Sequence, residues 1–219
     1  MDRIKAAAAE SDFFVLNGDV FDFRWTTLPT IEETVRAAVD WLREFAEAHP
    51  QCRILYVMGN HDNLDLFAEH LAELSGRTPN LDWHPSHVRL GNALFLHGDL
   101  VFDHWGPASP FVRPFSPTVV KKSKAARAGY RVLHTMRIQR WHAPLFRRKR
   151  CAKRVLRSLE AVGLPEGVTD IYFGHTHLKF SNYAHGGLVF HNTGSTIRGL
   201  RCGILPVRIL GGPDSCAAG

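Results

Sequence analysis

The segment ILYVMGNHD, residues 54–62, joins a short apolar run to a polar turn and decides the fold. Its first part, Ile54–Met58, has the composition of a buried β-strand, and the turn Gly59–Asp62 follows it directly. In open α/β sheets, ligands bind at the carboxyl ends of the strands. The segment therefore predicts an α/β fold in which functional side chains follow the strands.

Three other apolar runs end in polar turns of the same kind. Phe13–Leu16 is followed by Gly18 and Asp19, Ala93–Leu96 by His97, and Ile171–Phe173 by Gly174, His175, Thr176 and His177. Carboxylate, amide and imidazole groups gathered at one sheet edge suit Mn²⁺, Fe²⁺ or Zn²⁺ and contain too much nitrogen for Ca²⁺ or Mg²⁺ alone. A polar turn cap would explain any one of these residues, but five at strand ends favour a metal site. The predicted ligands are Asp19, Asn60, His97, His175 and His177.

Between these strands the sequence predicts helices. Thr30 precedes an apolar pattern of helical period, and Glu33 lies three residues on, which is the spacing of a capping box. A second helix is predicted over Leu64–Leu74. The remaining predicted elements are the end of a helix at Asp2–Glu10, a hairpin of Val88–Leu90 with Ala93–Leu96, strands Leu188–His191 and Ile204–Leu210, and a loose tail Gly211–Gly219.

Positive charge is concentrated in one segment of the 219-residue chain. Of its 27 Lys and Arg residues, 15 lie between Arg113 and Arg157, where there is no Asp or Glu, and the rest of the chain has 12 basic and 21 acidic residues. We interpret about residues 105–160 as a helical insertion, with helices over Val119–Arg137 and Arg150–Val162, in a single domain spanning residues 1–219. Such a charge excess favours an anionic partner, whether phosphate, nucleic acid or a membrane surface, over a merely solvated face.

Composition excludes several protein classes. With 45% apolar and 22% charged residues, the chain is neither collagen-like nor disordered. It has no apolar run long enough to cross a bilayer and no apolar signal segment near its first residue. Its cysteines are scattered, at Cys52, Cys151, Cys202 and Cys216. These features predict a cytoplasmic protein without a transmembrane segment.

The motifs, in their order along the chain, resemble those of the calcineurin-like metallophosphoesterases. The matching motifs are Gly18-Asp19, Gly59-Asn60-His61-Asp62, His97-Gly98-Asp99 and Gly174-His175-Thr176-His177. The resemblance implies an α/β/β/α sandwich that holds two divalent metals, with Mn²⁺ the first choice and Fe²⁺ or Zn²⁺ as alternatives. It further implies that Asp19 bridges both metals, that Asn60, His97 and His175 complete the shell of one, and that His177 binds the other.

The same resemblance implies catalytic roles for His61 and Asp62. His61 would lie over the substrate phosphate and stabilise the leaving oxygen, and Asp62 would orient it. A hydroxide bridging the two metals would attack phosphorus in line. Asp99 is expected to belong to a turn or to orient His97 rather than to bind metal.

The family's Asp-x-His motif, which ends the first strand of the sandwich, is missing before Asp19. The upstream acids are Asp2, Glu10 and Asp12, and no His precedes Asp19. One metal site would then keep only Asp19 and His177 as protein ligands, so this chain could hold one metal instead of two. We also expect a truncated or misassigned start, with an apolar strand and Asp-x-His encoded in frame upstream.

A narrower resemblance concerns the substrate. Gly18–Asp22, the basic insertion and the run Asn192–Ser195 are similar to those of UDP-2,3-diacylglucosamine hydrolases, which act in lipid A biosynthesis. This branch cleaves the pyrophosphate of an amphipathic, UDP-linked acylated sugar at the cytoplasmic membrane face, so peripheral contact with anionic membrane is expected. Candidate substrate contacts are Lys179, Arg198, Arg147, Arg148 and Arg150. The alternatives are a nuclease or other phosphodiesterase, and a non-catalytic relic that binds nucleic acid or anionic membrane.

Overall fold

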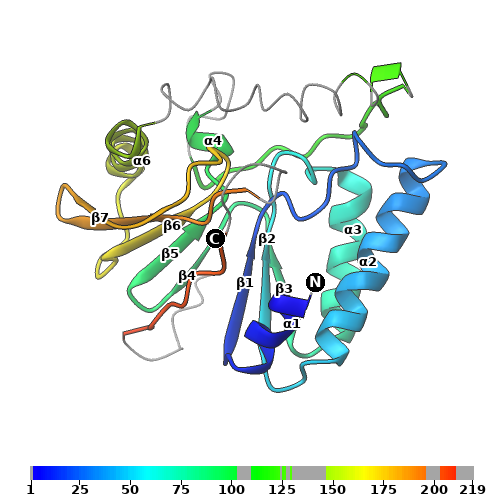
Figure 1. The fold of residues 1–219 in the computed structure, drawn as a ribbon, viewed down its shortest axis with the longest axis horizontal. Coiled ribbons are helices and arrows are strands. Elements are labelled where there is room, and N and C mark those ends of the chain that lie inside the picture. The colour runs from blue at the N-terminus through cyan, green and yellow to red at the C-terminus, as the bar shows by residue number, and fades with distance from the viewer. Residues whose placement is uncertain are drawn as a thin grey trace. The chain divides into compact units, whose positions relative to one another are not determined.

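A computed structural model describes residues 2–102, 110–123, 125–126, 129, 147–195 and 203–210 of the chain. The chain divides into two compact units, one formed by Met1–Pro85 with Pro114–Ser123 and the other by Ser86–Arg113 with Lys124–Gly219. Each unit has its own β-sheet and its own helices (Figure 1). Two sheets with helices confirm the predicted α/β fold class.

The first unit is built on a parallel three-stranded sheet in the order β1-β2-β3. Its strands are β1 (Phe13–Asn17), β2 (Arg53–Val57) and β3 (Leu81–His84), and its helices are α1 (Asp2–Ala9), α2 (Ile31–Glu47) and α3 (Asp65–Arg77). Asn17 of β1 is in register with Val57 of β2, so these two strands end at the same level. The loops that carry Asp19 and Gly59–Asp62 therefore leave the sheet at the same end.

The helix α2 begins where the capping signal predicts. The Glu33 N–H donates to Thr30 Oγ1 at 3.0 Å, and Thr30 has the extended backbone of an N-cap residue. The buried positions of α2 keep the helical period and are Val35, Ala38, Leu42, Phe45 and Ala46. The helices α2 and α3 lie side by side (Figure 1), and the apolar faces of both belong to the core of the first unit.

The second unit is built on a mixed five-stranded sheet in the order β4-β5-β6-β8-β7. These strands are β4 (His87–Leu90), β5 (Ala93–Leu96), β6 (Asp170–Phe173), β7 (Phe180–His185) and β8 (Leu188–Asn192). The pairs β5–β6 and β6–β8 are parallel, whereas β4 and β7 pair antiparallel at the two edges. The Gly174 N–H donates to the His97 carbonyl oxygen at 2.9 Å, so the loops after β5 and β6 are in direct contact.

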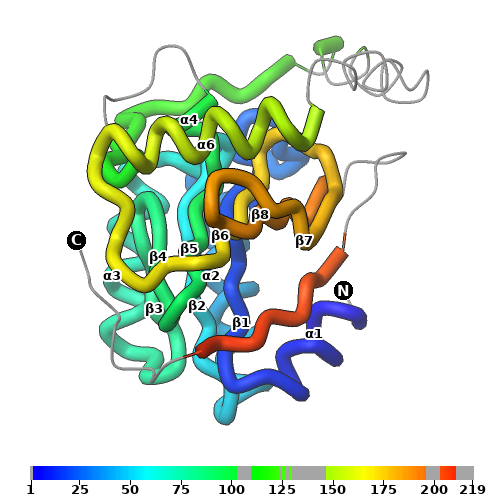
Figure 2. The backbone as a smooth tube through the Cα atoms, turned by 90° about the vertical axis from the view of Figure 1, so that its left-hand side faces the viewer, coloured from blue at the N-terminus to red at the C-terminus, as the bar shows by residue number. Residues whose placement is uncertain are grey.

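Two helices of the second unit bear on its function. The one-turn helix α4 (Asp99–Phe102) follows β5, and α6 (Arg148–Val162) lies against the sheet (Figure 2). The buried side of α6 packs with Leu94, Ile171 and Phe190, and consists of Cys151, Ala152, Val155 and Leu159. The predicted helix Arg150–Val162 is therefore confirmed, as a core helix with an exposed basic face. Among the described helices, none has the length and apolar composition needed to cross a membrane.

Several elements differ from the prediction. The strands β3 and β7 are absent from it, and Ile204–Leu210 forms no strand, contrary to the prediction. Pro206 lies inside that segment and has no N–H to give to a strand ladder. Residues 119–123, which begin the predicted helix Val119–Arg137, are not helical. Most of the remainder of that helix and the predicted tail Gly211–Gly219 fall outside the described residues.

Candidate metal centre

In the first unit, the loops after β1 and β2 meet at the carboxylate of Asp19. The backbone N–H of His61 donates to Asp19 Oδ1 at 2.8 Å. A Cβ atom added to Gly59 would lie 2.2 Å from Asp19 Oδ1 and 2.4 Å from its backbone nitrogen, so only glycine fits there. The glycine of the motif Gly59–Asp62 therefore serves to bring Asp19 against the second loop.

The buried carboxylate of Asp62 ties the same two loops together. It is fully buried, and its Oδ1 accepts the Gly59 N–H at 2.6 Å. Its Oδ2 accepts the Val20 N–H at 3.1 Å and the Tyr56 hydroxyl at 2.5 Å. Burial, reinforced by the Asp62 charge, raises the pKa of Tyr56 well above its usual value, so this hydroxyl remains a donor. Asp62 thus fixes the loop geometry around Asp19 and His61.

The ring of His61 is oriented by Asp22. His61 Nδ1 lies 2.8 Å from Asp22 Oδ2, and the two side chains are 36% and 39% exposed. The expectation that Asp62 orients this ring is therefore wrong, because Asp62 is engaged with both loops. The hydrogen bond that His61 donates to Asp22 raises the pKa of His61 against the lowering effect of burial, and the charge of Asp19 adds to the rise. The contact with Asp22 thus favours the protonated ring more than in a free imidazole.

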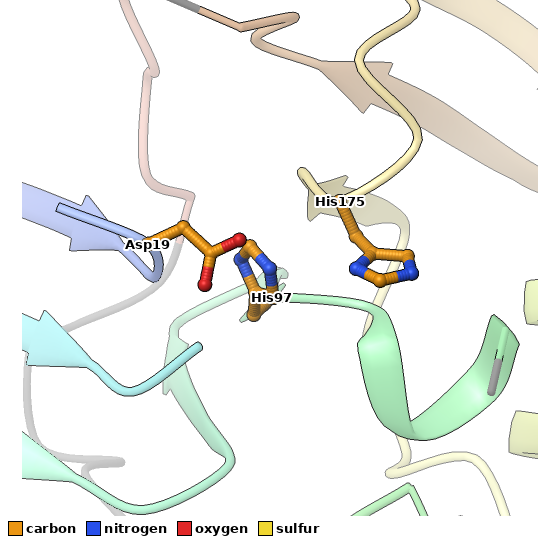
Figure 3. A group of neighbouring side chains, drawn as sticks. All are labelled: Asp19, His97 and His175. Carbon is orange, nitrogen blue, oxygen red and sulfur yellow. The ribbon is translucent and has the colours of Figure 1, made fainter. Parts of the chain in front are cut away.

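In the second unit, His97 and His175 stand at the ends of the adjacent parallel strands β5 and β6. Their ring centroids are 5.5 Å apart with an interplanar angle of 82°, and their ligand nitrogens lie within 4.8 Å. Two imidazoles bound to one ion at about 2.1 Å have ring centres about 5 Å apart, so this pair fits a shared metal ion. Figure 3 shows these two side chains and that of Asp19, which belongs to the first unit; a carboxylate and imidazoles are donor types that divalent transition metals select.

The loop that carries His175 is braced by Asn192 at the end of β8. The fully buried Asn192 side chain donates from Nδ2 to the Gly174 carbonyl oxygen at 2.8 Å and to Thr176 Oγ1 at 3.1 Å. His175 has a positive φ of 59°, a conformation that side-chain-bearing residues adopt only when their surroundings hold them in it. The hydrogen bonds on both sides of His175 supply that restraint.

Asp99, the last residue of the motif His97-Gly98-Asp99, forms a buried ion pair with Arg113. Arg113 Nη1 and Nη2 donate to the two carboxylate oxygens of Asp99, both at 2.7 Å, and the side chains are 1% and 3% exposed. Burial alone would raise the pKa of Asp99, but the Arg113 hydrogen bonds and the charges of Arg113, His97 and His175 outweigh it and lower the pKa. Asp99 is therefore a buried carboxylate whose geometry is set by Arg113.

The other predicted site residues lie on or near these loops. Asn60 is partly buried directly after Gly59. His177 has a φ of +56°, is exposed and does not join the His97–His175 pair. The predicted substrate contacts that the structure describes are all exposed, and they are Lys179, Arg147, Arg148 and Arg150. Arg198 falls outside the described residues.

The site predicted from the sequence does not include three residues that contact the predicted site residues in the structure. They are Asp22, Tyr56 and Arg113. The sequence could have indicated Asp22, because this acidic residue lies only three residues after Asp19 in the same polar segment. Tyr56 is indistinguishable in the sequence from the apolar strand positions around it, and Arg113 from the other cations of the basic segment. Their partners lie 6 residues away for Tyr56, 14 for Arg113 and 39 for Asp22, and no pattern of composition identifies these pairs.

Comparisons with known proteins address the family. The search of curated proteins found no significant match. Residues 1–179 match the sequence model of a family described as calcineurin-like phosphoesterase. The match spans every motif from Gly18 to His177 and most of the 219-residue chain. The chain therefore belongs to the calcineurin-like phosphoesterase family.

Proposed function

We propose that Asp19, Asn60, His97 and His175 hold a divalent cation with which the protein hydrolyses phosphodiester or pyrophosphate bonds. Family membership makes the protein a metal-dependent phosphoesterase. The observation that carries the assignment is the His97–His175 pair, whose ring spacing matches two imidazoles on one ion. A carboxylate and an amide added to two imidazoles form a ligand set that suits Mn²⁺, with Fe²⁺ or Zn²⁺ as alternatives.

His177 is proposed to bind a second cation together with Asp19. When bound, divalent cations acidify water and neutralise charge on the phosphate oxygens. The second position has fewer protein ligands in this chain than the first, since Asp19 and His177 are its proposed holders. We therefore expect the first position to fill at lower metal concentration than the second.

His61 is proposed to donate a proton to the leaving oxygen. The Asp22 carboxylate holds Nδ1, which leaves Nε2 as the ring nitrogen available to substrate. The raised pKa extends to higher pH the range in which the ring can act as a proton donor. Asp62 acts indirectly, because it holds the loops on which His61 and Asp19 lie.

The first experiment tests whether the chain turns over at all. The full chain is stripped with a chelator, and hydrolysis of bis(p-nitrophenyl) phosphate is measured with and without added Mn²⁺ or Zn²⁺. We expect turnover only with added metal, because the side chains alone supply no activated water. Absence of turnover with every metal would overturn the enzymatic proposal and favour a non-catalytic member of the family.

For the natural substrate we propose the pyrophosphate of a UDP-linked acylated sugar presented at the cytoplasmic face of an anionic membrane. The support is the Gly18–Asp22 motif together with the basic start of α6, where Arg147, Arg148 and Arg150 are all exposed. Cations at the beginning of a helix are unfavourable for the helix itself, since that end carries partial positive charge. An anionic partner at this end would relieve the repulsion.

Replacing Arg147, Arg148 and Arg150 together by Ser tests this proposal. Each Arg near an anionic surface contributes about 1 kcal/mol of binding, so action on vesicle-borne substrate is expected to weaken strongly at low salt and less at physiological salt. Hydrolysis of a small soluble diester serves as the control and is expected to change little. Equal losses on both substrates would contradict a role in membrane contact, and faster hydrolysis of single-stranded nucleic acid than of the lipid would favour a nuclease.

A further inference from the structure

The one-turn helix α4 is held at both ends by arginines of the basic segment. At its beginning, Arg113 binds the Asp99 carboxylate through two hydrogen bonds. At its end, Arg154 of α6 donates from Nε to the Val101 carbonyl oxygen at 2.8 Å and from Nη2 to the Phe102 carbonyl oxygen at 2.9 Å. The last carbonyl groups of a one-turn helix have no hydrogen-bond partner within the helix, and Arg154 donates to two of them. Its positive charge also lies at the C-terminal end, where the helix dipole favours a cation.

Arg154 also contacts the side chain of Phe102. Its guanidinium carbon lies 5.3 Å from the centre of the Phe102 ring, within the range of a cation–π contact. The neighbours of Arg154 on α6, Cys151 and Val155, are buried in the core of the second unit. The guanidinium therefore projects from a fixed base and restrains both the backbone and the ring of Phe102.

Phe102 also contacts the proposed metal ligand His175. The rings of Phe102 and His175 are stacked, with centroids 6.0 Å apart and an interplanar angle of 22°. Phe102 also stacks on Phe173, the last residue of β6, at 6.2 Å and the same angle. A continuous set of contacts thus runs from Arg154 through Phe102 to the imidazole of His175.

We propose that Arg154 and Phe102 are positioning residues that fix the orientation of the His175 imidazole for metal binding. The proposal rests on the proposed function, because it takes His175 to be a metal ligand. The bonds that Asn192 makes to Gly174 and Thr176 restrain the backbone on either side of His175, whereas the orientation of the imidazole depends on its own side-chain torsions. The flat face of Phe102 restricts that rotation, and Arg154 holds Phe102 in place.

The test measures Mn²⁺ binding to the full chain by isothermal titration calorimetry, without substrate. Arg154→Gln and Phe102→Leu are each expected to weaken Mn²⁺ binding roughly 10–100-fold, the usual effect of losing a residue that orients a metal ligand. Phe102→Tyr keeps the ring and is expected to restore most of the affinity. Arg157→Gln, on the exposed side of α6, is the matched control and is expected to bind as the parent does.

Thermal unfolding of the metal-free variants separates positioning from stability. If Arg154→Gln lowers the unfolding temperature but binds Mn²⁺ with unchanged affinity at a temperature where it is folded, Arg154 is only structural and the proposal fails. His175→Ala distinguishes the two levels of inference. If that variant binds Mn²⁺ as well as the parent, the assignment of His175 as a ligand fails, whereas a loss with His175→Ala but not with Phe102→Leu overturns the positioning role alone.

Discussion

Replacing His61 by Gln is expected to lower kcat about 10²–10⁴-fold, the usual contribution of a general acid, with little change in KM. The glutamine side chain has a similar volume, but its amide is not acidic enough to give a proton to the leaving oxygen. The measurement is steady-state hydrolysis of a soluble diester at saturating Mn²⁺. An unchanged kcat would remove His61 from catalysis.

The Asp22→Asn variant tests the origin of the His61 pKa. Asp22 is the largest cause of the raised pKa, so its neutralisation is expected to lower that pKa. A proton donor is active below its pKa, and the alkaline decline of kcat/KM should therefore move to lower pH. A decline that stays at the same pH would show that another group controls it. Asp22→Glu, which keeps the charge, should leave the decline closer to its original position.

Replacing Arg113 by Met is expected to reduce the free energy of unfolding by about 3–5 kcal/mol. The variant leaves the carboxylate of Asp99 buried without its bidentate partner, which is one of the most destabilising single changes available in a protein interior. Urea unfolding followed by far-ultraviolet circular dichroism measures the loss. Arg36→Met, which removes an exposed Arg from α2, is the matched control and should change stability by less than about 0.5 kcal/mol.

The pH dependence of this loss follows from the lowered pKa of Asp99. A carboxyl group with a depressed folded-state pKa stabilises the protein above its unfolded pKa and ceases to do so as pH falls through the folded value. The difference in the free energy of unfolding between the parent and Arg113→Met should therefore be largest near neutral pH and should decrease below a pH of about 4. The double variant Asp99→Leu/Arg113→Met should recover much of the stability, because no charge is left unpaired. A gap that persists unchanged in acid would contradict this electrostatic account.

The parts of the fold that the sequence predicts are those with a local cause. The helix α2 begins where the Thr30 hydroxyl accepts the backbone N–H of Glu33, and the spacing of these two residues can be recognised in the sequence. The strands β2, β5 and β6 are short apolar runs because nearly all of their residues, on both faces, are buried. For the same reason the polar turns after them could be placed at strand ends from composition alone.

The parts that it does not predict depend on distant partners. The edge strand β7 is mostly polar and carries a register irregularity between Phe180 and Tyr183, so it lacks both the apolar run and the alternation of a typical strand. The Ile204–Leu210 segment has apolar residues, but pairing in a sheet depends on a neighbouring strand that its composition does not specify.

The candidate site divides in the same way. Ligand types could be predicted because metals select oxygen and nitrogen donors, whatever the remainder of the chain does. The partners of those donors could not, since two Asp residues, Asp22 and Asp62, lie near His61 in the fold and only the geometry decides between them. The charge pattern also does not distinguish buried from exposed arginines of the basic segment. Arg113 is buried, whereas Arg150 is exposed.

Three of the proposed ligands, Asp19, His175 and His177, have left-handed backbone angles, with φ of +52°, +59° and +56°. Each such residue costs about 1–2 kcal/mol relative to the right-handed conformation, a strain that glycine would not feel. At these positions a substitution by glycine would therefore relieve backbone strain but remove a proposed metal ligand. A library of variants selected only for surviving high temperature would drift toward glycine there and yield robust but inert proteins. Directed evolution of this scaffold needs selection for turnover at every round, with its stabilising substitutions sought away from these three turns.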